Sequence, residues 1–444
     1  MCVYNDFASN FLIILNKYVD REYLNSDRCF IKKKCKLSFE DTVYYPLLQE
    51  GHTNSREAND YIRMITGDIY AMLSQTAVGK KRAFIDPKLY IDMYRDYIDD
   101  LYSQFKDDLT WRGYNCYAGD TSVIRVPNVS KTKEEFPVHQ HKPARARLSM
   151  FADVLHGFVI DAKLVEKKSS EAQLAIEHLH QLKKRRPDEN SLVTYDRGYN
   201  SFDLIFNHIY LDIDFLIRLK DSTLSTEIEK STTSDDEIIK LYLNKQRTNR
   251  ITDDKIREKF EKERYISLRV TKVQVTGKDS NEYTETLLSS LPMDKFSKED
   301  IKELYGLRWR IETEFERIKH ILELENFTGQ RRIIIEQDVY SKIFLLNLLL
   351  TIKKDADREI QKIHKNKDLK HEYQANSNHL LGSLQPFLYK LINSETLNER
   401  QKITNHIMTL AKQRLVLKKD ERIKDPERHT GDTEADYKSN NRKA

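Results

Sequence analysis

The chain has 444 residues, and its 75 Lys and Arg against 70 Asp and Glu leave a net charge of only +5. Hydrophobic residues make up 39% and charged residues 33%, which indicates a globular protein of two or three domains and excludes a disordered chain. The low counts of 12 Gly and 9 Pro favour long helices. With so little net charge, a surface that binds phosphate requires local segregation of basic residues.

The cysteines and the apolar runs give no sign of a structural zinc site or of a membrane span. Cys2, Cys29, Cys35 and Cys116 have neither C-x2-C spacing nor nearby histidine pairs, so reduced thiols are expected. The N-terminus does not resemble a signal peptide, and the longest apolar run, 343–352, is too short to cross a bilayer. We therefore expect a cytoplasmic protein without a membrane partner.

The first 110 residues predict an all-helical domain. Apolar residues recur at helical spacing in the segments 7–19, 39–49, 58–73 and 87–105. The joints between them, 31–36 and 76–84, are basic or polar. Short helices with Lys- and Arg-rich joints suit a DNA-binding domain whose joints contact phosphates. A plain helical bundle with solvated lysines is the alternative.

From residue 114 the pattern changes to short β-branched and aromatic runs, which predict strands. Three of them precede a helix at 169–184, and two follow it; His156 and Gly157 form the turn between the second and the third. This order predicts an α/β fold with a ribonuclease-H-like mixed sheet and flanking helices. In such a fold, acids at strand ends meet an acid from a later helix. The predicted strands are 114–127, 147–156, 157–166, 191–195 and 209–220.

The domain boundaries follow from these patterns. We expect a catalytic domain over 111–353, interrupted at about 221–296 by a mainly β insertion that is charged at first and ends in two strands. A helical C-terminal region should cover 354–417, with helices near 378–392 and 396–417. The tail, 418–444, has almost no apolar residues and many charges, which predicts disorder.

The most informative run, 297–324, predicts one amphipathic helix. At roughly 100° per residue, Tyr305, Arg308, Glu312 and Lys319 share an arc of about 60° beside the apolar stripe. A solvated face would lie opposite that stripe, so this acid among cations at the edge of a core favours a binding role over a surface ion pair. The stripe consists of Ile301, Leu304, Ile311, Phe315, Ile318 and Leu322.

These residues also carry a resemblance. The spacing Y-x2-R-x3-E-x6-K, with Trp309 beside Arg308, resembles the signature of DDE transposases of the insertion sequence 4 family. In that family the Glu, here Glu312, is the last of three metal-binding carboxylates. The segment 74–90 resembles the end of the family's N-terminal region, which favours DNA binding there. The resemblance covers roughly residues 70 to 335.

The other two carboxylates are expected near strand ends. Asp196 follows the apolar strand 191–195 and begins the sequence Asp-Arg-Gly-Tyr, which resembles the family's second-Asp motif. Asp120 lies in a segment similar to the first-Asp motif, although Gly119 precedes the Asp instead of following it. Asp153, also in a predicted strand, is the alternative. Other acids are expected to be exposed strand or turn residues: Asp161, Asp212 and Asp214.

Three carboxylates suit Mg²⁺ or Mn²⁺, and two such ions can activate the attacking oxygen and stabilise the leaving one. We therefore expect Asp120, Asp196 and Glu312 to be the catalytic and metal-binding residues. The pair His139 and His141, among basic residues, is expected to belong to a basic loop. The expected DNA-binding residues are Arg197, Tyr305, Arg308, Trp309 and Lys319, where Trp309 either stacks on an unpaired base or serves packing.

The resemblance implies a prokaryotic transposase, associated with the nucleoid when bound to DNA. It would bind terminal inverted repeats of double-stranded DNA as a homodimer, cleave the transposon ends, and join the 3′-hydroxyl ends to target DNA. The second strand would be cut through a hairpin. Two alternatives stay open: a ribonuclease-H-like nuclease without strand transfer, and a catalytically inactive domesticated DNA-binding protein.

Overall fold

The fold is seen in a computed structural model. Three predicted features lie outside its described residues: most of the joint 31–36, the pair His139 and His141, and the tail beyond Lys418. The structure describes residues 7–19, 21–25, 30, 36–105, 110–137, 142–219, 233–276, 282–365 and 371–418.

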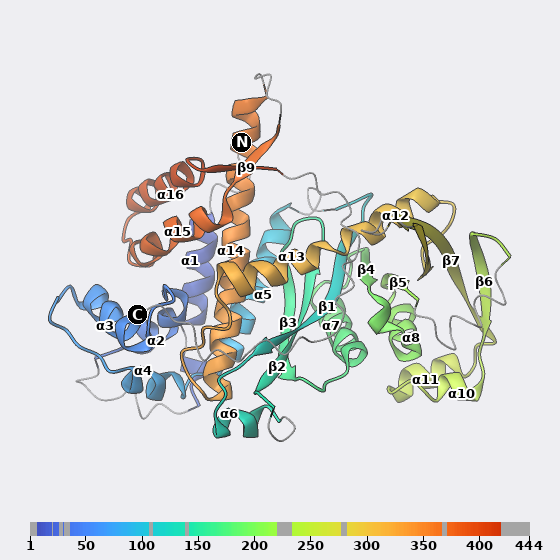
Figure 1. Ribbon diagram of the computed structural model, residues 1–444, viewed down its shortest axis with the longest axis horizontal. Coiled ribbons are helices and arrows are strands. Elements are labelled where there is room, and N and C mark those ends of the chain that lie inside the picture. The colour runs from blue at the N-terminus through green and yellow to red at the C-terminus, as the bar shows by residue number, and fades with distance from the viewer. Residues whose placement is uncertain are drawn as a thin grey trace.

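The centre of the molecule is an eight-stranded sheet in the order β3-β2-β1-β4-β5-β8-β7-β6 (Figure 1). β1, β2 and β3 are antiparallel neighbours, while β4 pairs parallel with β1 and β5 parallel with β4. This arrangement confirms the predicted ribonuclease-H-like mixed sheet with flanking helices. The strands are β1 (Asn115–Arg125), β2 (Arg145–Asp153), β3 (Val159–Glu166), β4 (Ser191–Tyr195), β5 (Asp214–Arg218), β6 (Asp236–Tyr242), β7 (Tyr265–Thr276) and β8 (Glu282–Ser289).

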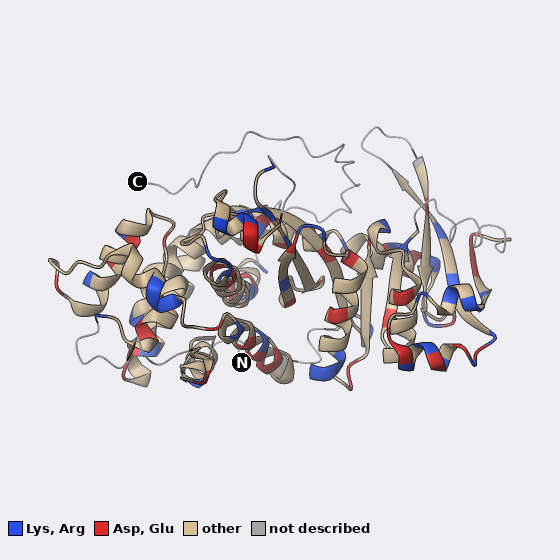
Figure 2. Ribbon diagram, turned by 90° about the horizontal axis from the view of Figure 1, so that it is seen from below, with Lys and Arg blue, Asp and Glu red and all other residues tan. Residues whose placement is uncertain are grey.

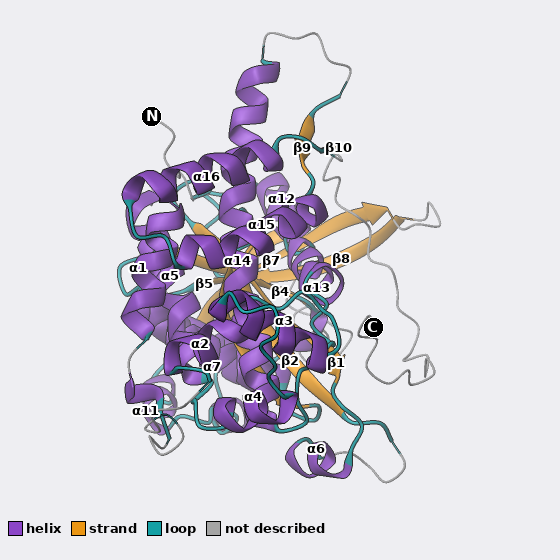
Figure 3. Ribbon diagram, turned by 90° about the vertical axis from the view of Figure 1, so that its left-hand side faces the viewer, coloured by secondary structure: helices purple, strands orange, loops and turns teal. Residues whose placement is uncertain are grey.

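The strands of the expected insertion extend this same sheet beyond β5. β8 pairs antiparallel with β5, and β7 and β6 follow it outward. Figure 3 shows β7 and β8 reaching away from the helical part of the molecule. α11 (Asp254–Phe260) and the turn before it contribute isoleucines and a phenylalanine to the core. These side chains are buried together with inward-facing residues of β6 and β7. α10 (Lys245–Thr248) precedes α11.

The outer edge of β3 is covered rather than exposed, which protects its backbone from pairing with another chain. Asn347 of α14 (Arg332–His364) accepts from the backbone N–H of Val159 at 2.8 Å and donates to its carbonyl at 2.9 Å. Two tyrosine hydroxyls accept from further N–H groups of β3: Tyr340 of α14 from Leu164, and Tyr94 of α5 (Lys88–Phe105) from Ala162. These contacts explain the polar residues that interrupt the apolar pattern of α14.

α14 is buried on nearly all sides. It extends past residue 353, the predicted end of the catalytic domain, without interruption. Figure 1 shows it between the sheet and the helices from both ends of the chain. α1 (Phe7–Tyr18) and α5 pack on it from the N-terminal region, and α15 (Ser377–Ile392) and α16 (Leu397–Ala411) from the C-terminal region. Among the described helices, none is long and apolar enough to cross a membrane. The remaining helices are α2 (Phe39–Tyr44), α3 (Asn54–Thr66), α4 (Gln75–Arg82), α6 (Ser130–Glu135), α7 (Glu171–Arg185) and α8 (Phe202–Leu211), with short strands β9 (Tyr373–Ala375) and β10 (Leu415–Leu417).

Several predicted elements differ in the structure, and the predicted helix at 396–417 is one of them: it ends with α16, and β10 follows. Most of the joint 76–84 is a helix, α4, whose N-cap Ser74 accepts from the N–H of Ala77. The segment 209–211, assigned to a strand, ends α8, and the strand β5 begins only at Asp214. β6 lies in the charged first part of the expected insertion, before the two strands predicted at its end. As an edge strand with exposed Ile238 and Tyr242, it lacks the buried apolar run that marks a central strand.

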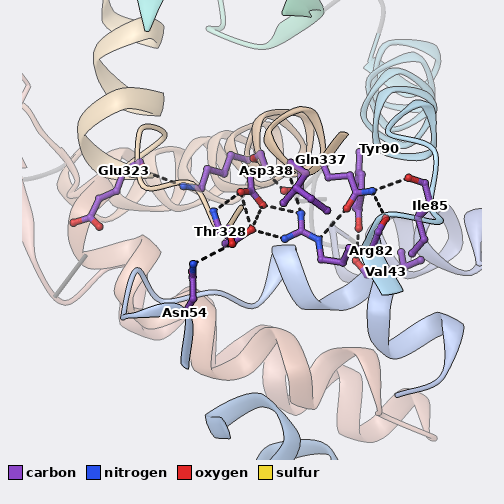
Figure 4. Close-up of polar contacts among 12 residues, drawn as sticks. Val43, Asn54, Arg82, Ile85, Tyr90, Glu323, Thr328, Gln337 and Asp338 are labelled. Atoms are coloured by element: carbon purple, nitrogen blue, oxygen red, sulfur yellow. Dashed lines mark hydrogen bonds and ion pairs between the residues drawn. The ribbon is translucent and has the colours of Figure 1, made fainter. Parts of the chain in front are cut away.

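Arg82, at the end of α4, does not contact phosphate as a joint residue would. Its side chain is 1% exposed and ion-paired with Asp338 of α14 at 2.7 Å (Figure 4). It also donates to Oε1 of Gln337 at 2.9 Å and to Oγ1 of Thr328 at 2.5 Å. Gln337 in turn donates to the carbonyls of Arg82 and Ile85. The expectation that this basic segment contacts DNA is therefore wrong for Arg82, which ties the N-terminal helices to α14.

Candidate active site

Asp120 and Asp196 lie side by side on neighbouring parallel strands. Ala118 of β1 pairs with Thr194 of β4, and the same register two residues later brings Asp120 beside Asp196, which directly follows β4. Adjacent strands are about 4.8 Å apart, so both carboxylates emerge from one face of the sheet within reach of a shared ligand. The local sequence explains the position of Asp196: the fully buried strand ends there, and the chain turns into a 3-10 helix.

The predicted helix at 297–324 is wrong as a single continuous helix. It is divided into α12 (Lys298–Leu307), α13 (Arg310–Glu316) and a π-helical turn at Arg317–Ile321. Around Arg308 the backbone bonds tighten to i→i+3: the N–H of Arg308 donates to Tyr305 and that of Glu312 to Trp309. Such tightening and a π turn change the angle per residue, so the helical wheel does not hold over the whole run. Gly306, a poor helix former, directly precedes the break.

Tertiary contacts fix α13 over the sheet. Arg310 donates to the backbone carbonyls of Val154 at 3.0 Å and Leu155 at 3.3 Å, in the turn after β2. Gly157 in that turn has φ +82°, and a Cβ there would lie 2.6 Å from a carboxylate oxygen of Glu314. The predicted His156–Gly157 turn is confirmed, and it needs Gly for both reasons. This docking brings Glu312, on the first turn of α13, toward Asp120 and Asp196.

Two of these carboxyl groups, Asp120 and Glu312, have a raised pKa. The pKa of Asp120 is raised to about 7, mainly by burial and to a smaller extent by the charges of Glu312 and Asp196, while Arg308 and the N–H of Thr121 act in the opposite direction. The pKa of Glu312 is also raised, through burial and through Asp196. An excess of buried negative charge is the usual setting for a bound cation.

Arg308 is buried among these acids with part of its hydrogen-bonding capacity unused. Its side chain is 2% exposed, and neither Nε nor Nη2 has a hydrogen-bond partner among the described residues. Its nearest acidic atom is Oε1 of Glu312, 3.6 Å from Nη2. Its guanidinium carbon lies 3.9 Å from the ring centre of Trp309. The hydroxyl of Tyr305 is likewise buried without a hydrogen bond, and burial raises its pKa to about 12.

Two residues near Asp196 were missed in the sequence. Arg218, the last residue of β5, has Nη1 at 3.7 Å from Oδ1 of Asp196, and its Nε is ion-paired with Glu285 of β8. Burial raises the pKa of Glu285, and the charge of Asp196 raises it further. Polar residues at the end of an apolar strand, as in the stretch 213–218, are a signal that could have marked Arg218. No comparable sequence signal marks Glu285, because β8 reaches this site only through the extended sheet.

The alternative first carboxylate, Asp153, lies on the other face of the sheet. It pairs with Tyr117, whose side chain points toward α7, whereas Asp120 is of opposite parity. Its oxygens already accept from the hydroxyl of Tyr102 and from the backbone of Leu155 and His156. A buried acid with its acceptors filled in this way stabilises a turn and is not open to a ligand.

Asp161, expected to be exposed, is 3% exposed and paired with Arg95 and His178, so this prediction was wrong. The other two acids differ. Asp212 is exposed at the end of α8, as predicted, and Asp214 is partly buried and accepts from Ser290. Alternation along a strand assigns a face but does not reveal that helices cover both faces of this sheet.

The remaining predicted DNA-binding residues differ in how freely they could meet a ligand. Arg197 is exposed in the turn after Asp196. Trp309 is partly buried against Arg308. Lys319 donates to Oγ of Ser122 at 2.6 Å and to the carbonyl of Val123 at 3.3 Å, close to Asp120 along β1.

Within the described part of the chain, no three acidic, His or Cys side chains are yet gathered closely enough to hold a metal ion. The residue types nevertheless fit a hard divalent cation: three carboxylates lie on one face of the sheet, and Oδ1 of Asp196 is buried without a hydrogen bond from any described residue. Glu312 is 47% exposed on α13, so its side chain has room to turn toward the two aspartates.

Three comparisons with known proteins bear on this site. No curated protein sequence matches the chain. The cryo-EM structure of the piggyBac transposase synaptic complex with hairpin DNA is similar at a TM-score of 0.41 and 12% identity, over 92% of this chain and 84% of that chain. Residues 111–348, more than half of the chain, match the sequence profile of the transposase DDE domain. The chain therefore belongs to the DDE transposase family, as its resemblance to transposases of insertion sequence 4 predicted.

Proposed function

We propose that this transposase cleaves the ends of its own transposon and joins them to target DNA at the site formed by Asp120, Asp196 and Glu312. The observation that carries the proposal is the buried Arg308: it lies among all three acids and leaves Nε and Nη2 without hydrogen bonds. A buried guanidinium with open donors is suited to bind a phosphate oxygen in bidentate fashion. Acids for cations and an arginine for phosphate together match a phosphodiester substrate.

The three carboxylates would hold Mg²⁺ or Mn²⁺, one or two ions. Ions bound there would polarise the scissile phosphate and lower the pKa of an attacking oxygen. In the cleavage step, water attacks phosphorus, the bond to the 3′ oxygen breaks, and a 3′-hydroxyl and a 5′-phosphate remain. In the joining step, that 3′-hydroxyl attacks a target phosphodiester and releases another 3′-hydroxyl. Arg308 and the hydroxyl of Tyr305 would orient the phosphate in both steps.

The DNA around the site would be held by exposed or partly exposed residues. Arg197 lies next to Asp196, and Lys319 lies along β1 from Asp120, so both can reach flanking phosphates. Trp309 would support the Arg308 guanidinium by stacking. Figure 2 shows Lys and Arg interspersed with Asp and Glu along most elements in that view, which favours local contacts over one uniformly basic face. We further propose that a homodimer pairs the two transposon ends, each bound at its terminal inverted repeat.

The test is cleavage of a labelled transposon end, with its native flanking sequence, in the presence of Mg²⁺. Glu312→Gln keeps the side chain's shape and removes its charge, so we expect cleavage to fall by about a thousandfold or more while DNA binding persists. Equal cleavage by variant and wild type would refute the site. Cleavage without joining to target DNA would identify a nuclease, and binding without cleavage an inactive DNA-binding protein.

A further inference from the structure

The sheet aligns Arg218 with the two aspartates. Tyr195 of β4 pairs with Ile217 of β5, so the next position brings Arg218 beside Asp196, in the row that begins with Asp120. Arg218 in turn pairs with Leu287 of β8. Glu285 is two residues from Leu287 and therefore lies on the same face, diagonal to Arg218. The inserted strands thus place an acid at the end of this row.

Arg218 lies between two acids and forms a close ion pair with only one of them. Its Nε is ion-paired with Oε2 of Glu285, whereas its Nη1 lies 3.7 Å from Oδ1 of Asp196, beyond hydrogen-bond distance. The exposed fractions of these two side chains are only 16% for Arg218 and 12% for Glu285, so water screens the pair weakly. Oδ1 of Asp196 is itself buried and accepts no hydrogen bond from the residues that the structure describes.

An arginine beside an aspartate ordinarily closes to a direct, often bidentate pair at about 2.8 Å. Such a closed pair would occupy the oxygen that a cation needs. We propose that Glu285 is a positioning residue that draws the Arg218 guanidinium away from Asp196 and so keeps an oxygen of Asp196 available to a divalent cation. This inference rests on the proposed function, because it assumes that Asp196 binds metal.

The experiment measures Mn²⁺ binding to the DNA-free protein by electron paramagnetic resonance. In Glu285→Gln the pull on Arg218 is lost, Arg218 closes on Asp196, and the Kd for Mn²⁺ should rise about tenfold, as competition with one charge-assisted hydrogen bond implies. Adding Arg218→Ala to this variant should restore tight binding. The matched control is Glu258→Gln, an exposed acid on α11, which should bind as wild type does. A crystal structure of Glu285→Gln should show the 3.7 Å distance shortened to about 3 Å.

A purely structural role for Glu285 predicts something different: the double variant would bind no better than Glu285→Gln. That result, or unchanged binding by Glu285→Gln, would overturn the inference. If wild type binds no Mn²⁺, the proposed metal function fails instead. The inference then stands or falls with the Arg218–Asp196 distance in the crystal structure of Glu285→Gln, which needs no metal to be read.

Discussion

The protein contains two equally buried arginines that differ in how far their hydrogen-bonding capacity is filled. Arg82 and Arg308 are both 1% exposed, and both lie beside carboxylates. Arg82 donates from all three nitrogens, to Thr328, Gln337 and Asp338 among others (Figure 4). Among the described residues, Arg308 has no hydrogen-bond partner for two of its nitrogens, and its ion pair with Glu312 spans 3.6 Å.

Under the proposed function, this difference separates a structural site from a phosphate-binding site. A buried donor without a partner costs about 1 to 3 kcal/mol, more when charged, so it persists only where the surrounding fold imposes it. The Arg82 network carries no such cost, because the donors of Arg82 have partners, and it stabilises the junction of α4 with α14. The Arg308 site keeps the cost, which a phosphate ligand can remove. Burial alone therefore does not identify function; unfilled hydrogen-bonding capacity does.

The largest effect should come from breaking the satisfied network. Arg82→Met leaves Asp338 buried without its cation, and we expect a loss of about 3 to 5 kcal/mol in the free energy of unfolding. Urea unfolding followed by circular dichroism measures it. Asp338→Asn in the same protein should recover part of the loss, because it removes the unpaired charge. A single variant as stable as wild type would show that the network contributes little.

Arg308→Met should lower activity without lowering stability. We expect cleavage of the transposon end to fall about a hundredfold, since one set of preorganised donors to the phosphate is lost. The free energy of unfolding should stay the same or rise by up to about 3 kcal/mol, because the variant removes buried donors that had no partners. Parallel cleavage and unfolding assays check both halves. A strongly destabilised variant would mean that Arg308 is structural, as Arg82 is.

Asp120→Asn should show a stability effect that depends on pH. The pKa of Asp120 is raised to about 7 in the folded protein, so the protonated carboxyl favours folding and its ionisation opposes it. Without metal, the variant should therefore gain stability relative to wild type as the pH rises from about 4 to about 7, reaching about 4 kcal/mol at pH 8. Thermal unfolding across this range measures the difference. Mn²⁺ should reverse it by stabilising only wild type; a difference independent of pH would contradict the assignment.

Lys319→Met should have the smallest effect, about tenfold on cleavage. Lys319 already donates to Ser122 and Val123, so less of its hydrogen-bonding capacity remains for a phosphate. Cleavage at several salt concentrations measures it, because the loss of one phosphate contact also lowers the salt dependence of DNA binding. Lys402, exposed on α16, provides a control lysine outside the predicted DNA-binding segments. A loss as large as that of Arg308→Met would place Lys319 at the reacting phosphate.

Much of the fold was predictable because local patterns agreed with the tertiary structure. The fully buried strand 191–195 reads as a short apolar run, and the helix after Ser170 carries its N-cap in the sequence. The neighbourhood of Asp120 with Asp196 follows from the parallel register of β1 and β4. The proximity of Glu312 to them was predicted from spacing and resemblance.

The errors arose where distant contacts override local signals. The segment of α4 has two lysines and an arginine and reads as a polar joint, yet α14 supplies Asp338 and Gln337 to bury its last residue. The break at Arg308 combines a local weakness at Gly306 with the docking of Arg310 onto the turn after β2. Neither contact is visible in a window of ten or fifteen residues.

The sequence by itself determined the family, the order of the elements and the spacing of Tyr305, Arg308 and Glu312, because these depend on residues close along the chain. The tertiary structure decided which acid joins the site, since the pleat of β2 turns Asp153 to the opposite face from Asp120. It also decided that Arg218 and Glu285 lie beside Asp196. Strand pairing sets both outcomes, and pairing between residues so far apart leaves no periodic signal in the chain.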